Sequence, residues 1–304
     1  MKAIIDLGTN TFHLLIAEVT GDEVAILKKL QIPVKIGEGG INNNQIAAVA
    51  FERGINGLAL FRKELNIFGI KECVAYGTSA IRDASNGPNF IAQAQALFNI
   101  QIEVLSGNQE AELIYEGVKH SLELPNENVL VMDIGGGSVE FIIGKKDTIL
   151  WKKSYSIGAA RLIDRFHQTN PILDEEIVTL QSYLVHNIVE LRDALQKYPA
   201  RILIGSAGSF ETLIDVLEKD LRYPTQNLSD HACEIPLDAF VKFYDLMTSL
   251  TVNQRSALHG MADFRVEMIV VATILTDVVL KRFEMNRLIA SRYSLKEGIL
   301  FSKK

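Results

Sequence analysis

The chain has 304 residues, of which 48% are hydrophobic and 22% charged, and its formal net charge is −6. This length is enough for two hydrophobic cores, and the acidic balance argues against nucleic acid as the main partner, because proteins that rely on phosphate contacts with nucleic acid are usually basic. The most apolar stretch, residues 268–280, is interrupted by Thr276 and Asp277 and is shorter than the roughly 20 apolar residues that a membrane span needs.

The first half of the chain alternates predicted strands and helices. β-Branched and aliphatic residues predict strands at residues 2–8, 13–19, 23–37, 100–107 and at the start of 71–86. Apolar residues at helical spacing predict helices at residues 44–69 and 108–122. This α/β unit closes near Leu124 and Pro125.

The second half opens with a strand at Val129. Residues 175–199 predict one long amphipathic helix, which Pro199 ends. A strand, a Gly/Ser loop and a helix follow at residues 200–219, a helix at 263–283 and a strand from 287. Because no linker separates the halves, we expect them to pack directly against each other across a cleft.

Two segments repeat one pattern, one at the start of each half. The segment "AIIDLGTNTFHLLIA" spans residues 3–17, and "VLVMDIGGGSVEFIIG" spans residues 129–144. The aligned pairs are Asp6 with Asp133, Gly8 with Gly135, and Thr11 with Ser138. Two ordinary hairpins with Asp-Gly turns would look the same, but a matched pair that opens both halves favours a shared function.

The chemistry of both turns fits a phosphate chain. Glycine lets the backbone approach a ligand closely, and turn N–H groups and a hydroxyl can donate to phosphate oxygens. Aspartate is an oxygen ligand suited to hydrated Mg²⁺. Two such turns would grip a phosphate chain from both sides, and the residues predicted to bind phosphate there are Gly8, Thr9, Asn10, Thr11, Gly135, Gly136, Gly137 and Ser138.

The two repeats resemble the phosphate motifs of the superfamily that contains actin, Hsp70 and the sugar kinases. Within it, the chain is similar to the Ppx/GppA family of exopolyphosphatases and guanosine-pentaphosphate phosphohydrolases, through "YGTSAIRDASN", "LSGNQEAELIYEGV", "SIGAARLIDRF" and "GSAGSFETL". The resemblance implies an α/β protein of two ribonuclease-H-like (actin-like ATPase) domains with mixed sheets, in the short two-domain form. We expect domain one at residues 1–122, with residues 291–304 as a candidate completion of it, and domain two at 123–290.

Hydrolysis of a phosphoanhydride needs a water held in line with the leaving oxygen. By resemblance, Glu110 of "NQEA" is the catalytic residue, and a carboxylate at a helix start beside the cleft would be desolvated and able to accept a proton. The alternative is structural, because residues 106–109 read as a capping box and an acidic first turn stabilises the helix dipole.

Asp133 and Glu140 flank the second turn, and the resemblance assigns them to metal and water positioning in catalysis. Asp6 would do similar work in the first turn, so a divalent cation, Mg²⁺ or another such as Mn²⁺, is the expected cofactor. The alternatives are Asx-turns for the two aspartates and a solvent-facing strand position for Glu140.

Arg82 is the arginine expected to bind phosphate, because the family carries one there and a guanidinium can form two parallel bonds to phosphate. A surface helix arginine is the alternative. Arg161 and Arg165 lie four residues apart and would form a basic rim or pair with Asp164. Lys145–Lys146 and Lys152–Lys153 read as solvated turns.

The six histidines form no HxH or HxxxH pair, and nothing supports a zinc site or a Ser-His-Asp triad. His13 aligns with Glu140, and we read it as a structural histidine, with a place in the cleft as the alternative.

Two departures from the family pattern argue against an adenine nucleotide. Residues 263–275 contain no glycine where the family keeps a glycine-rich helix start, so bulkier side chains should crowd a nucleoside held at "GSAGSFETL". Ser294 and Lys296 stand where relatives often show glycine and arginine.

The sequence therefore predicts a metal-dependent phosphohydrolase that releases terminal phosphate from inorganic polyphosphate. The alternatives are a 5′-phosphohydrolase of guanosine pentaphosphate (pppGpp), an ATP-dependent kinase and an actin-like assembly protein. No nucleic-acid or membrane partner is expected, and family habit suggests a homodimer. The two cysteines have no metal-ligand spacing and no signal peptide precedes the first strand, which favours the cytoplasm.

Overall fold

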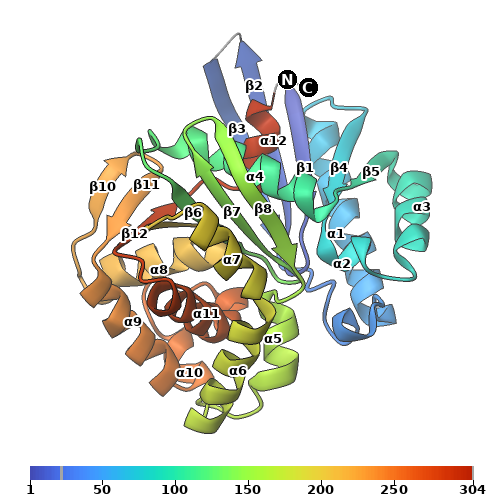
Figure 1. Ribbon diagram of the computed structural model, residues 1–304. Coiled ribbons are helices and arrows are strands. Elements are labelled where there is room, and N and C mark those ends of the chain that lie inside the picture. The colour runs from blue at the N-terminus through green and yellow to red at the C-terminus, as the bar shows by residue number, and fades with distance from the viewer. Residues whose placement is uncertain (21–22, 303–304) are drawn as a thin grey trace.

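The computed structural model describes residues 1–20 and 23–302 and contains two sheets of mixed strand direction (Figure 1). The N-terminal sheet has the order β3-β2-β1-β4-β5, with β1 (Lys2–Leu7), β2 (Phe12–Thr20), β3 (Glu23–Ile32), β4 (Cys73–Gly77) and β5 (Ile100–Val104). The C-terminal sheet has the order β10-β11-β12-β9-β6-β7-β8, with β6 (Val129–Ile134), β7 (Val139–Lys145), β8 (Thr148–Tyr155), β9 (Ile202–Ser206), β10 (Gln226–Ser229), β11 (Ala232–Ile235) and β12 (Arg287–Ser291).

The two sheets share one topology. Strand β1 pairs antiparallel with β2 and parallel with β4, and β6 pairs antiparallel with β7 and parallel with β9. In each sheet the third strand extends the hairpin, because β3 pairs with β2 as β8 pairs with β7. The C-terminal sheet continues through β12 to the β10–β11 hairpin. The duplicated α/β fold expected from the repeated turns is confirmed.

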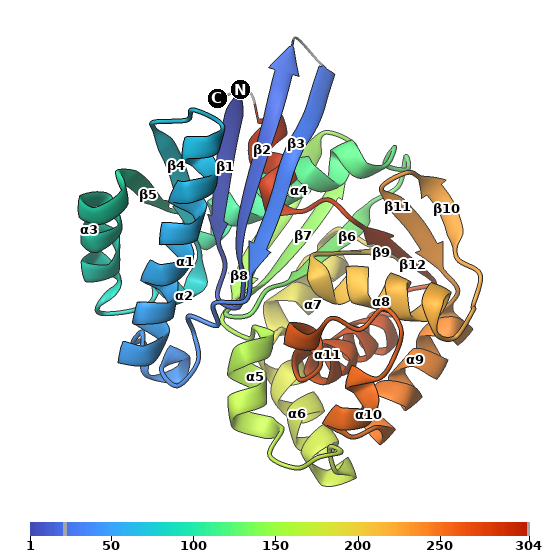
Figure 2. The ribbon, with the colours of Figure 1, turned by 180° about the vertical axis from the view of Figure 1, so that it is seen from behind.

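Helices cover the outer faces of both sheets (Figures 1 and 2). The N-terminal sheet carries α1 (Ala48–Ile67), α2 (Ser79–Arg82) and α3 (Gly87–Phe98), whose Leu58, Phe61 and Phe90 are buried with Phe12 of β2. The C-terminal sheet carries α5 (Ala159–Phe166), α6 (Asp174–Asn187), α7 (Val189–Lys197), α8 (Gly208–Lys219), α9 (Leu237–Ser249), α10 (Val252–Ser256) and α11 (Met268–Arg282). Two 3₁₀ turns, η1 (Ile41–Asn43) and η2 (Asp263–Arg265), complete the elements outside the layer between the sheets.

Two helices lie between the sheets, α4 (Gly107–Ser121) and α12 (Leu295–Phe301). Their side chains share an apolar core with both sheets, in which Ile4 of β1 and Val131 of β6 are both buried. The helix backbones touch where they cross, because a Cβ on Gly298 would lie 1.7 Å from the Leu113 carbonyl oxygen. This crossing fixes the start of α4 relative to the start of α12, and both starts border the candidate site.

The last helix also contacts the first strand. The Lys2 ammonium donates to the carbonyl oxygens of Ile299 (3.3 Å) and Leu300 (3.2 Å). These contacts support the division expected from the sequence, which we propose here: residues 1–122 with 291–304 as one domain, and residues 123–290 as the other. Within residues 1–20 and 23–302, no helix combines the length and hydropathy needed to cross a bilayer.

Two local expectations were wrong. The helix expected over residues 175–199 is two helices, α6 and α7, which meet at Ile188. The ψ angle of Ile188 is 25°, outside the helical range, although its side chain keeps the apolar spacing of both helices. Lys152 and Lys153 lie in strand β8, which period-two patterning alone did not reveal. Both lysines pair with carboxylates of neighbouring elements, Glu112 and Glu190, so neither lies in a solvated turn.

Candidate active site

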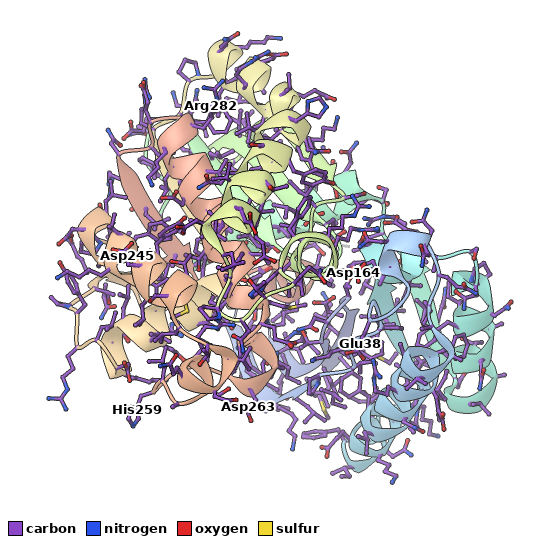
Figure 3. All side chains as sticks on the ribbon, turned by 90° about the horizontal axis from the view of Figure 1, so that it is seen from below. Glu38, Asp164, Asp245, His259, Asp263 and Arg282 are labelled. Carbon is purple, nitrogen blue, oxygen red and sulfur yellow. The ribbon has the colours of Figure 1, made fainter. Side chains whose placement is uncertain are left out.

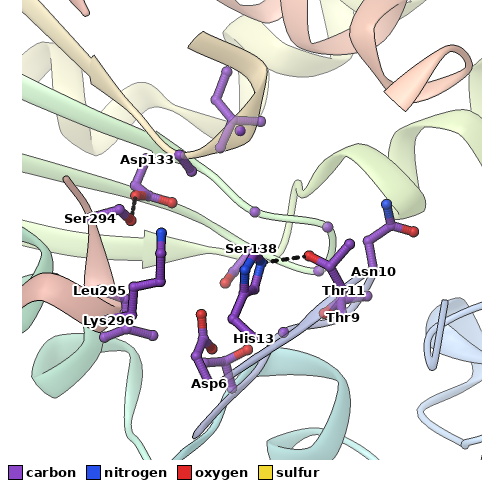
Figure 4. Close-up of a pocket in the computed structure, with 18 of the residues that line it drawn as sticks. Asp6, Thr9, Asn10, Thr11, His13, Asp133, Ser138, Ser294, Leu295 and Lys296 are labelled. Atoms are coloured by element: carbon purple, nitrogen blue, oxygen red, sulfur yellow. Dashed lines mark hydrogen bonds between the residues drawn. The ribbon is translucent and has the colours of Figure 1, made fainter. Parts of the chain in front are cut away.

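The two repeated turns border one cavity, which holds about 90 Å³ (Figure 4). The β1–β2 turn contributes residues 8–11, and the β6–β7 turn contributes residues 135–138. The turns nearly touch, since a Cβ on Gly137 would lie 2.6 Å from the Thr9 Oγ1. Glycine is therefore required at residue 137 by close approach. The expectation that both turns face a single pocket between the two halves is confirmed.

Asp6 and Asp133 lie at matching places at the ends of β1 and β6, and both line the cavity. Burial raises the pKa of Asp6 to about 7, and its buried Oδ1 has no hydrogen-bond partner within the described residues. Asp133 Oδ2 accepts from the hydroxyls of Ser206 and Ser294, each at 2.6 Å. Partners this distant in the sequence are not those of an Asx-turn. Burial also raises the pKa of Asp133.

Glu140 is 1% exposed, so the alternative of a solvent-facing strand residue was wrong. It lies on β7 directly opposite Asp133 and accepts a 2.6 Å hydrogen bond from Ser154 on β8. Burial, together with the negative charges of Glu110 and Asp133, raises the pKa of Glu140 well above its usual value. Such a carboxyl is hard to ionise without a cation or a donor beside it.

Glu110 lies in the first turn of α4 and is 6% exposed. The capping box expected before it is present, because Gln109 N donates to Ser106 Oγ while Gln109 Oε1 accepts from Ser106 N. The capping box provides hydrogen-bond partners at the start of α4 without Glu110. The Glu110 carboxylate instead lines the cavity. Burial raises the pKa of Glu110 to about 7 in spite of the nearby Arg82. A carboxyl that titrates near neutral pH is suited to general-base catalysis.

Arg82 does not lie where a phosphate-binding residue would be expected, at the wall of the cavity. Its guanidinium donates to Glu110 Oε2 at 2.9 Å and to the Leu105 carbonyl oxygen at 3.0 Å, and Asp83 lies 3.4 Å away. It is not among the residues that line the cavity. In this conformation the arginine therefore holds the Glu110 carboxylate, and any bond to phosphate would have to replace one of these contacts.

The carboxylates fit a cation that keeps water or substrate oxygens among its ligands. Across the described residues, 1–20 and 23–302, no three His, Cys, Asp or Glu side chains form a metal-binding cluster. Asp6, Asp133 and Glu140 therefore do not form a complete cage. Mg²⁺ is typically bound by one or two carboxylates, water and substrate phosphates, so the unpartnered Asp6 oxygen and the Asp133 carboxylate are donors of the right kind.

Two cationic residues of the cavity were missed as site residues in the sequence. Lys296, in the first turn of α12, and Arg265, at the end of η2, both line it. Lys296 was noted only as a departure from the family pattern. Arg265 packs on the start of α8, where a Cβ on Gly208 would lie 1.9 Å from the guanidinium. Arg265 belongs to residues 263–275, the segment whose bulk was expected to crowd a nucleoside, but its contact with Gly208 is visible only in the three-dimensional arrangement.

Arg161 is buried, so neither the basic rim nor the pairing with Asp164 was right. Its guanidinium donates to the Gly137 carbonyl oxygen (2.8 Å), the Ile41 carbonyl oxygen (2.7 Å) and Asp83 Oδ2 (2.8 Å). One side chain of α5 therefore connects a phosphate turn to two loops of the N-terminal half.

The same junction carries a second cavity of about 160 Å³, and its lining includes Glu38 and Asp164, both labelled in Figure 3. The Asp164 carboxylate accepts from Asn42 at 2.6 Å. Arg165 does not line the phosphate cavity, and it donates to the Tyr183 hydroxyl at 3.0 Å.

The description of the Ppx/GppA phosphatase family matches this chain over residues 15–304. The chain belongs to the Ppx/GppA phosphatase family. It is 30% identical to a Haemophilus influenzae protein named as an exopolyphosphatase, over 99% of this chain and 90% of that protein. The match to a Fusobacterium nucleatum bifunctional 3-dehydroquinate synthase/phosphatase is 32% identical but spans only 45% of that protein.

Solved structures of the family share the fold. A crystal structure of an exopolyphosphatase from Cytophaga hutchinsonii has 38% sequence identity and a TM-score of 0.93, covering 98% of this chain and 96% of that one. The Aquifex aeolicus family member has 26% identity and a TM-score of 0.78, with 98% and 95% of the chains covered. Membership of this phosphatase family identifies the chain as a hydrolase of phosphate compounds with an actin-like, two-domain fold.

Proposed function

We propose that this protein hydrolyses the terminal phosphoanhydride of inorganic polyphosphate and releases orthophosphate. The observation that carries the proposal is the cavity between the two Asp-Gly turns, which has Glu110 in its wall. Relatives of 30% and 38% identity that are named as exopolyphosphatases support this choice of substrate.

The residues divide into a base and a set of charge-neutralising groups. We assign the Glu110 carboxylate to accept a proton from the attacking water, while the Arg82 guanidinium, 2.9 Å away, keeps it oriented. The N–H groups of residues 8–11 and 135–138 would donate to phosphate oxygens, and Lys296 and Arg265 would neutralise their charge. The water oxygen attacks the terminal phosphorus, and the bridging P–O bond breaks toward the shortened chain.

A divalent cation, Mg²⁺ or Mn²⁺, would be held by Asp6 and Asp133 together with substrate oxygens, and by Glu140 through water. When bound, it supplies positive charge to the phosphate oxygens. The buried Asp6 oxygen that lacks a partner supports this assignment. A homodimer and a cytoplasmic location, both expected from the sequence, remain predictions.

The side chain at the position where a nucleoside would be expected argues against ATP as the substrate. Arg265 covers Gly208 at the start of α8, where the family resemblance places the adenosine of an actin-like ATPase. An ATP-dependent kinase would need that space. A charged guanidinium there instead favours further phosphate groups of a linear chain.

The experiment measures orthophosphate release from polyphosphate, pppGpp and ATP, each with Mg²⁺ and again with EDTA. We expect kcat/KM to be highest for polyphosphate and the activity to be lost with EDTA. A higher kcat/KM for pppGpp would transfer the assignment to that substrate. Activity with ATP alone would contradict the proposal.

A further inference from the structure

His13 touches the hydroxyl of the first phosphate turn. Its Nε2 lies 2.9 Å from Thr11 Oγ1, and both residues line the cavity (Figure 4). Thr11 is 6% exposed, so its hydroxyl has little access to bulk water. Thr11 is one of the residues expected to bind phosphate, whereas the mechanism proposed above gives His13 no role.

The second turn has the same geometry but a different partner. His13 lies directly opposite Asp6 on the β1–β2 hairpin, and Glu140 lies directly opposite Asp133 on the β6–β7 hairpin. There the Ser138 hydroxyl hydrogen-bonds to the Glu140 carboxyl group. A carboxyl group offers an oxygen that can accept a hydrogen bond from the Ser138 hydroxyl, whereas a protonated Nε2 of an imidazole can only donate. The two turns therefore differ in what their hydroxyl groups can offer a ligand.

The Nε2 atom of His13 can either donate to the Thr11 hydroxyl or accept from it, depending on where the ring carries its proton. A neutral imidazole carries one N–H. With the proton on Nε2, the ring donates to Thr11 Oγ1 and leaves the Thr11 proton free for a phosphate oxygen. With the proton on Nδ1, Thr11 must donate to the ring and turn its lone pairs toward the anion. An anion in the cavity therefore favours the Nε2–H tautomer.

We propose that His13 is a positioning residue that donates to Thr11 and thereby fixes the Thr11 hydroxyl as a donor to substrate phosphate. The N-terminal turn then binds a phosphate oxygen through the Thr11 hydroxyl. The Ser138 hydroxyl of the C-terminal turn instead forms a hydrogen bond with Glu140. This inference rests on the proposed function, since it assigns the phosphate chain to the same cavity.

The test is a double-mutant cycle with the full chain, Mg²⁺ and polyphosphate. His13→Phe removes the ring nitrogen that faces Thr11, and His13→Asn is too short to replace it. His13→Gln places an amide N–H near the position of Nε2 and is the matched control. Thr11→Val removes the hydroxyl and keeps the shape of the side chain.

A hydrogen bond to an anion is stronger than one between neutral groups, so Thr11→Val should raise KM by roughly tenfold or more, and His13→Phe and His13→Asn by about five- to tenfold. We expect kcat to change less than about twofold, His13→Gln to restore KM, and His13→Phe to add almost nothing in the Thr11→Val background. Multiplicative effects of the two substitutions, or an unchanged KM in both His13→Phe and His13→Asn, would overturn the proposal.

A second measurement separates this inference from the proposed function. Sodium tripolyphosphate in EDTA should raise the melting temperature of the unmodified protein and of His13→Gln, but raise it much less for His13→Asn and Thr11→Val. If the protein released no phosphate from polyphosphate yet showed this pattern, the proposed activity would fall and the role of His13 would stand. An equal rise in all variants would refute the role of His13 even in an active enzyme.

Discussion

Replacing Glu110 by glutamine should lower activity and raise stability together. Glutamine keeps an oxygen that can accept from the Arg82 guanidinium, which lies 2.9 Å from the native carboxylate, but it cannot accept the proton of water. General-base catalysis typically contributes about 10²–10⁴-fold to the rate. We therefore expect kcat for phosphate release to fall at least about a hundredfold while KM changes little.

The stability gain follows from the buried carboxyl group. Its pKa rises from 4.5 to about 7 on folding, so the folded state disfavours the ionised form by about 3 kcal/mol at pH well above 7. Below pH 4.5 the Glu110 carboxyl is protonated in both the folded and the unfolded state and does not destabilise the fold. The free energy of unfolding then falls as the pH rises from there through 7. Glu110→Gln should remove this loss, and so raise the melting temperature by several degrees at pH 8 and much less at pH 5.

Calorimetry at both pH values and steady-state phosphate release provide the assays. The matched control is Glu112→Gln, on the same helix, which should change neither the rate nor the melting temperature because Glu112 is largely exposed and its pair with Lys152 lies at the surface. Since Glu110 must be ionised to act, kcat/KM of the unmodified enzyme should rise as pH increases through about 7. An undiminished rate in Glu110→Gln would refute the assignment of the base, and a lower melting temperature at pH 8 would refute the burial argument.

Three further changes test separate parts of the structure. Asp133→Asn should increase the Mg²⁺ concentration needed for half-maximal activity, as a Mg²⁺ titration of phosphate release would show; an unchanged titration would remove Asp133 from the cation site. Arg161→Met should destabilise the fold by about 3 kcal/mol in urea unfolding, because it removes the donor to the Gly137 and Ile41 carbonyl oxygens as well as the nearer cation of Asp83. A loss below about 1 kcal/mol would show that this contact between the halves is dispensable. Gly298→Val should prevent the normal packing of α12 on α4 and lower the melting temperature sharply, whereas the exposed Leu60→Ala should not.

The fold could be predicted because its signal is local and repeated. Two strands with one turn between them occur twice, and the capping box at residues 106–109 marks the start of α4 without reference to the rest of the chain. The break at Ile188 was missed, because its side chain keeps the apolar period of α6 and α7 while only its backbone departs from the helix. Side-chain periodicity carries no information on a backbone kink of that kind.

The sequence indicated the two turns that border the cavity, but it did not indicate the cationic residues that also line it. Glycines and aspartates at a tight turn can be recognised from their spacing in the sequence. Arg265 and Lys296 reach the cavity from η2 and α12, elements far from the turns in sequence. The contacts of Arg82 and Arg161 could not be read from the sequence for the same reason, because the packing of separate segments sets their partners, Glu110 and Gly137.

The central claim is that one phosphate chain is held between the two Asp-Gly turns with Glu110 beside its terminal group. A crystal structure of Glu110→Gln with Mg²⁺ and tripolyphosphate tests it most directly. The account predicts phosphate oxygens within hydrogen-bond distance of N–H groups in both residues 8–11 and residues 135–138, and a water between residue 110 and the terminal phosphorus. Tripolyphosphate bound to only one turn, or outside the cavity that the two turns border, would contradict it.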